Sequence, residues 1–260
     1  MALLNSLIDK FMEASRPIHF RGKTRFMNRI GPSEGTRSTR IFDAEFQLDL
    51  SDFIQRQIYL GVFEPHETRI ARTSLRPGMT FVDVGANVGY YTAVAANIVG
   101  KSGRVYAFEP SPYAFGKLRS MVERSRFSHV TATQCGLSDA PGKVNLYLGR
   151  DSHNHTPTMI AHENTDATAV SVDTLDNMSD VLGIDRIDLL KIDVEGYEAR
   201  VLAGASRLLG ARRIRAILCE FNEHWLSRAG SSPDHLEEIV RHAGFKEVIR
   251  YSDNRYFALP

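Results

Sequence analysis

From Thr80 onwards the chain alternates short apolar runs with segments of helical spacing, and this alternation constrains the fold most strongly. The apolar runs are rich in β-branched and aromatic residues and lie at 80–84, 105–108, 130–135, 187–192 and 216–219. Strands that alternate with helical patterns of about 10–15 residues are typical of βαβ units and a parallel sheet. We therefore expect an α/β fold built on a doubly wound, mostly parallel sheet.

Two strand pairs are expected in addition to this pattern. Residues 245–251 and 255–259 flank a short polar turn, which predicts an antiparallel hairpin at the C-terminus. Residues 143–148 and 168–172 predict a second pair, joined by a long polar connection.

The first 50 residues differ from the rest of the chain. Apolar residues recur at helical spacing as far as Met12, which predicts a short amphipathic helix. After it we expect a loop at 31–40, a short strand at 46–50 and a helix at 52–60. We place an N-terminal basic arm with a short helix at 1–50 and one main domain at 51–260.

Charge is unevenly distributed along the chain. The net charge is only +1, but residues 1–40 contain eight basic and three acidic residues, which gives +5 there and leaves −4 for the remainder. The whole-chain charge does not favour a nucleic-acid partner. The basic segment is either a solvated arm or a contact surface for an acidic glycan, an anionic lipid or a second subunit.

Composition indicates a soluble globular protein. Hydrophobic residues make up 43% and charged residues 24% of the chain, and no apolar run approaches the roughly 20 residues that span a bilayer. The first residues lack the order of a signal peptide, so we expect a cytoplasmic protein. Cys135 and Cys219 lie in apolar runs, and we interpret both as small core residues.

The turn after the first strand of the repeating pattern indicates the ligand, because ligands of open parallel sheets bind beyond the carboxyl ends of the strands. A dinucleotide fingerprint would require glycine at 85, 87 and 90, whereas the chain has Gly85, Asn87 and Tyr90. Asp83 would repel a phosphate but suits the ammonium of an amino acid, directly or through water. The amides at the start of the following helix suit the carboxylate of the same group.

Glu109 ends the second strand, 24 residues after Gly85. A carboxylate at this place suits two hydrogen bonds from a ribose diol. An amino acid joined to a nucleoside without phosphate describes S-adenosyl-L-methionine, which we expect as the cofactor.

Several segments together resemble the FkbM-type methyltransferases. The resemblance covers about 60–220 and is carried by Gly61–Pro65, Phe81–Thr92, Phe108–Pro110, Leu137–Asp139, Val172–Leu175 and above all Lys191–Glu198 (KIDVEGYE). It implies a Rossmann-like class I methyltransferase with a seven-stranded sheet. It also implies methyl transfer to a hydroxyl oxygen, often of a sugar in a glycolipid, a polysaccharide or a glycosylated natural product.

The resemblance also implies residues that contact the cofactor. They are Asp83, Gly85, Asn87, Gly89, Thr92 and Glu109, with Glu64 as an additional contact and with Ser138 and Asp139 near the adenine.

Deprotonation of a sugar hydroxyl calls for a general base or a metal ion. The candidates are Asp193 and Glu220, which follow the fourth and fifth strands, and His153 and His155 in the polar connection. An Asp193, Glu195 and Glu220 cluster would suit Mg²⁺, but we predict no metal ligand and take Mg²⁺ as the alternative to a base. For Glu195 and Glu198, favourable charge at a helix N-terminus is a simpler explanation.

Two other functions remain as alternatives. A methyltransferase of nucleic acid or protein would share this core, but the segment after the fourth strand lacks the prolines of amino-methylating DNA enzymes. A non-catalytic subunit that binds S-adenosylmethionine would retain the same cofactor motifs. The expected partner is a small-molecule or glycan acceptor, not a nucleic acid, and the sequence leaves the oligomeric state open.

Overall fold

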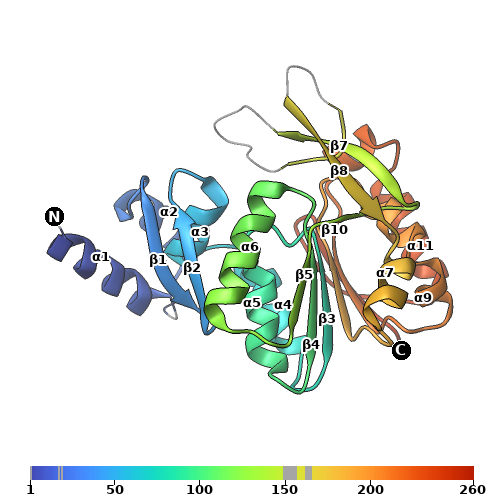
Figure 1. Cartoon of the computed structure of the whole chain (residues 1–260), viewed down its shortest axis with the longest axis horizontal. Coiled ribbons are helices and arrows are strands. Elements are labelled where there is room, and N and C mark those ends of the chain that lie inside the picture. Colours follow the sequence, from blue (N-terminus) through green and yellow to red (C-terminus); the bar gives the residue numbers. More distant parts are fainter. Residues whose placement is uncertain (1, 17, 19, 149–156, 162–165) are drawn as a thin grey trace.

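A seven-stranded sheet runs through the centre of the computed structural model (Figure 1), which describes residues 2–16, 18, 20–148, 157–161 and 166–260. The strand order is β11-β12-β10-β9-β3-β4-β5. The strands are β3 (Thr80–Val84), β4 (Arg104–Phe108), β5 (Val130–Thr133), β9 (Leu189–Ile192), β10 (Ala216–Glu220), β11 (Lys246–Tyr251) and β12 (Asn254–Ala258). The pairs among β5, β4, β3, β9 and β10 are parallel, whereas β12 is antiparallel to both of its neighbours. The expected mostly parallel sheet with a C-terminal antiparallel hairpin is confirmed.

Helices cover both faces of this sheet (Figure 1). Along β3, Val82 and Val84 pack into one hydrophobic cluster and Phe81 into another, because successive strand residues point to opposite faces. The face of Phe81 is covered by α4 (Pro65–Ser74), α5 (Tyr90–Val99) and α6 (Pro112–Ser125). The other face is covered by α7 (Leu175–Leu182), α8 (Glu198–Ala203), α9 (Ser206–Gly210), α10 (Glu223–Arg228) and α11 (Pro233–His242).

The N-terminal segment packs on this core through α6. It consists of α1 (Ala2–Ser15), α2 (Lys23–Ile30), the antiparallel strands β1 (Thr36–Ile41) and β2 (Ala44–Asp49), and α3 (Phe53–Leu60). Met12, Met27 and Phe46 share one hydrophobic cluster with Leu118 and Met121 of α6. The helix near the N-terminus, the strand at 46–50 and the helix at 52–60 are confirmed. The loop expected at 31–40 is wrong for residues 36–40, which belong to β1.

A small three-stranded sheet stands above the carboxyl ends of the central strands (Figure 1). It has the order β6-β8-β7 and consists of β6 (Gly136–Leu137), β7 (Gly142–Leu148) and β8 (Asp166–Asp173). The antiparallel pairing of β7 with β8 confirms the expected second strand pair. His153 and His155 lie outside the described residues.

The structure also describes the two cysteines and the length of the helices. Cys135 and Cys219 are both buried and form no disulfide, as expected for core residues. Within the described part of the chain, no helix combines the length and the apolar character needed to cross a membrane.

Candidate active site

The turn from β3 to α5 forms one wall of a cavity of about 300 Å³ at the carboxyl edge of the sheet. The backbone amides of Gly85 and Ala86 both donate to the carbonyl oxygen of Phe108 at 3.0 Å, which fastens the turn to the end of β4. Gly85 has φ +79°, and a Cβ there would lie 1.9 Å from the carbonyl oxygen of Asp193. Only glycine therefore fits at this position, where the ends of β3 and β9 approach each other.

Glu109 lies at the end of β4 and is fixed by the same turn. Its Oε2 accepts a hydrogen bond from the amide of Asn87 at 2.8 Å, and its Oε1 accepts one from the amide of Ser111 at 2.9 Å. Burial raises the pKa of Glu109 to about 7, although the two amide hydrogen bonds favour the ionised form. Each carboxylate oxygen has a second lone pair, so Glu109 can still accept hydrogen bonds from a ligand in the cavity that it lines.

Asp83 and Thr92 lie beside this wall and do not line the cavity. Thr92 Oγ1 donates to Asp83 Oδ2 at 2.7 Å, and both side chains are fully buried. Burial raises the pKa of Asp83, while Lys191 on the neighbouring strand β9 favours the charged form. Asp83 therefore lies near an internal cation, and its contact with the ammonium of a ligand, directly or through water, stays a prediction.

Glu64 enters the cavity from the start of α4. It precedes Pro65 with φ +36°, and its Oε2 accepts a hydrogen bond from the hydroxyl of Tyr91 at 2.7 Å. Burial, together with the nearby charge of Asp193, raises the pKa of Glu64 to about 7. The sequence predicted Glu64 as an additional cofactor contact, and Glu64 lines the same cavity as the glycine turn.

The remaining predicted cofactor residues lie close to the cavity without lining it. Gly89 caps α5 with φ +93°, and a Cβ there would meet side-chain atoms of Met121 and Leu118. Ser138 Oγ donates to Asp139, which pairs with Arg200 at 3.1 Å. Both follow β6, whose residues Gly136 and Leu137 do line the cavity.

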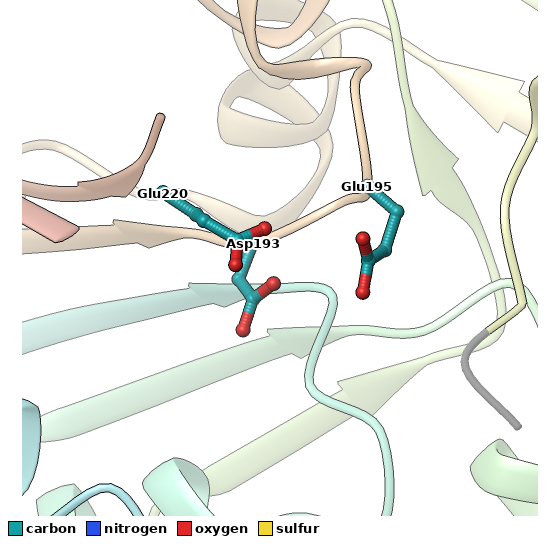
Figure 2. A group of neighbouring side chains, drawn as sticks. All are labelled: Asp193, Glu195 and Glu220. Carbon is teal, nitrogen blue, oxygen red and sulfur yellow. The ribbon is translucent and has the colours of Figure 1, made fainter. Parts of the chain in front are cut away.

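Three carboxylates from two neighbouring strand ends lie close together (Figure 2). Asp193 and Glu195 follow β9 and Glu220 ends β10, and each offers an oxygen within 4.8 Å of the other two. These are oxygen atoms that could hold a divalent cation, and all three residues line the cavity. Burial and the other carboxylates, Asp193 first among them, raise the pKa of Glu220 to about 10.

Lys191 compensates part of this negative charge. Its Nζ donates to Asp193 Oδ2 at 2.9 Å and lies 4.7 Å from the centre of the Tyr91 ring. Burial disfavours the ammonium, but Asp193, Asp83 and Glu64 outweigh that effect and raise the pKa of Lys191. Sequence reasoning gave Lys191 and Tyr91 no role. A lysine inside the apolar run 187–192 was the available signal, since buried lysines need partners.

Two further residues, Glu198 and His224, do not line the cavity. Glu198 is buried, and its Oε1 accepts hydrogen bonds from the amides of Val194 and Gly196, both at 3.2 Å. It thus supports the loop that presents Asp193, in addition to its place in the first turn of α8. His224 lies on the surface against Trp225 and does not line the cavity.

Comparison with known proteins shows a family match and several methyltransferase relatives. The FkbM domain of methyltransferases matches residues 83–247. The 31-O-demethyl-FK506 methyltransferase FkbM of Streptomyces tacrolimicus is 33% identical over 178 residues, which are 57% of this chain and 67% of that protein. Methyltransferase sdnD of Sordaria araneosa is 32% identical over 178 residues, 56% of this chain and 67% of that protein.

More distant similarity extends to a sugar-acid enzyme and to a solved structure. The hexuronic acid methyltransferase AglP of Haloferax volcanii is 25% identical over 167 residues, 64% of this chain and 63% of that protein. The crystal structure of methyltransferase FkbM from Methylobacillus flagellatus superposes with a TM-score of 0.48 at 16% identity, over 80% of this chain and 53% of that one. The match over residues 83–247 spans more than half of the chain, which therefore belongs to the FkbM family of S-adenosylmethionine-dependent methyltransferases.

Proposed function

We propose that this protein transfers a methyl group from S-adenosylmethionine to a hydroxyl oxygen of a sugar-containing acceptor. The observation that carries the proposal is that one cavity is lined both by the glycine turn with Glu109 and by the carboxylates Asp193 and Glu220. A cofactor site and a proton acceptor are the two parts that such a transfer requires.

The residues of the turn fit the cofactor. Glu109 accepts hydrogen bonds from the ribose hydroxyls, and the turn residues Gly85, Ala86 and Asn87 line the cavity where the cofactor would lie. Ser138 and Asp139 lie beside the adenine, next to the cavity wall at Gly136 and Leu137. Asp83 and Thr92 act through the turn and through Lys191, since neither lines the cavity.

Asp193 is the group that we assign as the base. Bound S-adenosylmethionine supplies an electrophilic methyl group on its sulfonium. Asp193 takes the proton of the acceptor hydroxyl while the oxygen–carbon bond forms and the carbon–sulfur bond breaks. Lys191 donates to Oδ2 of the Asp193 carboxylate, and Oδ1 is the oxygen that we assign to the acceptor. Burial and the neighbouring carboxylates raise the pKa of Glu220, which favours its protonated form, so we assign Glu220 as a hydrogen-bond donor.

A sugar acceptor suits the rest of the cavity. Phe53, Phe63 and Tyr90 contribute aromatic surface, and the carboxylates contribute hydrogen-bond acceptors. Apolar walls with a few placed polar groups are usual for sites of small molecules. Among the relatives, one is named for a hexuronic acid and another for 31-O-demethyl-FK506; the first name supports a sugar-derived acceptor and the second supports transfer to oxygen.

The experiment is an incubation with S-adenosylmethionine that carries a deuterated methyl group. Neutral sugars, sugar acids, a nucleic acid and a peptide serve as separate acceptors, and mass spectrometry locates the label. We expect a labelled methyl ether on a sugar. Label on nitrogen or carbon, or cofactor binding without turnover on any acceptor, would refute the proposal and favour the two alternative functions.

Two further experiments distinguish Asp193 from a metal ion and from His153 or His155 as the group that activates the acceptor hydroxyl. Loss of turnover in EDTA with recovery in Mg²⁺ would assign the carboxylates to a cation and remove the base role from Asp193. Loss of turnover in both His153→Ala and His155→Ala variants would instead move the base to the connection between β7 and β8. We expect turnover that is insensitive to EDTA.

A further inference from the structure

A second, larger cavity of about 840 Å³ lies between the N-terminal segment and α4. Four arginines line it, namely Arg16, Arg40, Arg69 and Arg72, and Glu13 is the one acidic residue on its wall. Such an excess of positive charge in a concave space attracts anions more strongly than the same charges on a flat surface.

Two of these arginines have no carboxylate partner among the described residues. Arg16 donates to the carbonyl oxygen of Arg40 at 2.7 Å, and Arg40 lies 3.6 Å from Asp43, so both have structural contacts. No described carboxylate lies within ion-pair distance of Arg69 or Arg72, which are both exposed. The guanidinium of Arg72 lies over the Phe42 ring, 5.9 Å from its centre.

The spacing along α4 gathers positive charge on one side of the helix. His66, Arg69 and Thr73 are separated by three and four residues, and Arg72 lies one turn after Arg69. Residues at this spacing share a helix face, where two like charges repel each other. An anion between the two guanidinium groups would relieve that repulsion, and their planar donors match a carboxylate or a phosphate.

The second cavity, with its four arginines, is here called the basic cavity, and it adjoins the active-site cavity. Ile58, Phe63 and Tyr90 line both of them. The rings of Phe63 and Tyr90 meet edge to face at 5.1 Å, and the hydroxyl of Tyr90 lies 3.2 Å from that of Thr68 on α4. The two cavities therefore share this aromatic wall and lie next to each other.

The part of the chain that builds the basic cavity differs from the part that matches the family. Apart from Tyr90, every residue that lines it precedes residue 83, where the family match begins. The cavity is therefore suited to a preference of this chain for a particular acceptor, whereas the cofactor turn lies within the shared region.

We infer that Arg69 and Arg72 bind a carboxylate or phosphate group of the acceptor while its hydroxyl lies beside Asp193. This inference rests on the proposed function and narrows it to an anionic acceptor. Neither arginine touches the reacting atoms, so both set specificity and affinity.

The test measures binding without turnover. Protein saturated with S-adenosylhomocysteine is titrated by calorimetry with methyl β-D-glucuronide, glucose 6-phosphate and the neutral methyl β-D-glucoside. We expect an anionic probe to bind about tenfold or more tightly than the glucoside, because charge-assisted hydrogen bonds are worth at least one factor of ten. The glucuronide and the phosphate separate the two sources of negative charge.

A double variant, Arg69→Gln with Arg72→Gln, should lose this preference and keep its affinity for S-adenosylhomocysteine. The matched control is Arg119→Gln with Arg124→Gln, two exposed arginines of α6 that do not line the basic cavity, and it should keep the preference. The preference should also shrink as salt is added. Equal binding of all three probes, no binding of any, or a preference that survives in the double variant would overturn the inference. Failure of the proposed function would appear separately, as an absence of methyl ether product.

Discussion

Lys191 and the carboxyl groups around it determine which acid at the site is free to take a proton. The ammonium is bonded to Asp193 and attracted by Asp83 and Glu64, so it stabilises negative charge near β9. Glu220 lies among carboxylates and has its pKa raised to about 10. Proton transfer therefore depends on the environment of each acid and not on its presence alone.

This difference predicts opposite results for two isosteric variants. Asp193→Asn should lower kcat by about 10²–10⁴, the usual contribution of a general base. Glu220→Gln should keep kcat within about tenfold, because the amide resembles a carboxyl group that already carries a proton. Steady-state kinetics with the acceptor found in the labelling experiment measures both. If Glu220→Gln is the more damaging variant, the two roles are exchanged.

Sequence reasoning located the acids better than it located their partners. Asp193, Glu220 and Glu109 were predicted to lie together because the carboxyl ends of parallel strands share one edge, and all three line the cavity. The proximity of Asp83 to Lys191 was not foreseen, since it comes from strand pairing that places the two residues opposite each other. That pairing joins residues more than 100 positions apart, and no local pattern shows it.

Among the elements, the turn between β3 and α5 has the least tolerance for change. Gly85→Ala would place a Cβ 1.9 Å from the carbonyl oxygen of Asp193 and would strain a residue with φ +79°. We expect a loss of roughly 1–3 kcal/mol in the free energy of unfolding from the strained backbone, together with loss of cofactor affinity. Thermal unfolding and calorimetry measure the two effects.

The control is Gly116→Ala, within α6, where a Cβ meets no atom within 4 Å. Alanine has a higher helix propensity, so this variant should be more stable by up to about 1 kcal/mol. A Gly85→Ala variant as stable as the natural protein and with the same affinity would show that the close approach of β3 and β9 is unimportant.

Elements with strong periodicity were predicted, and elements without it were missed. Strands β3, β4, β9 and β10 carry apolar runs that fit burial on both faces. Strand β1 reads Thr-Arg-Ser-Thr-Arg-Ile, and only Ile41 is buried. Its strand conformation comes from pairing with β2, which a polar sequence does not reveal. The pairing of a strand with its neighbour depends on tertiary contacts, so a local sequence pattern does not reveal it.

At the scale of the whole molecule, burial of carboxyl groups links stability to pH. Burial raises the pKa of Glu198 from 4.5 to about 7, although amide hydrogen bonds favour its ionised form. A raised pKa contributes stability at low pH that is lost as the pH rises through the folded-state value. The free energy of unfolding should therefore fall between pH 5 and pH 8.

Glu198→Gln removes this titration and retains an acceptor for the amides of Val194 and Gly196. Between pH 5 and pH 8 the natural protein should lose roughly 2–3 kcal/mol relative to this variant. Urea unfolding at several pH values measures the slope. Glu223→Gln, at an exposed position in the first turn of α10, is the control and should keep the natural slope. Parallel slopes for the natural protein and Glu198→Gln would contradict the raised pKa.

The N-terminal segment contacts both the hydrophobic core and the basic cavity. Charge alone left two interpretations of residues 1–40, a solvated arm or a contact surface. In the structure Met12 and Met27 are buried with α6, while Arg16 and Arg40 line the basic cavity. Side chains of one segment thus pack against α6 and also line the basic cavity, two positions that the distribution of charge along the sequence could not distinguish.

The central claim is that the cofactor occupies the cavity at the ends of β3 and β4, with its ribose on Glu109. Calorimetric titration of S-adenosylmethionine into the natural protein and into Glu109→Ala tests it most directly. We predict that the variant stays folded and binds more weakly by about 1.5–3 kcal/mol, the value of hydrogen bonds to a charged group. Unchanged affinity in a folded Glu109→Ala variant would contradict the account.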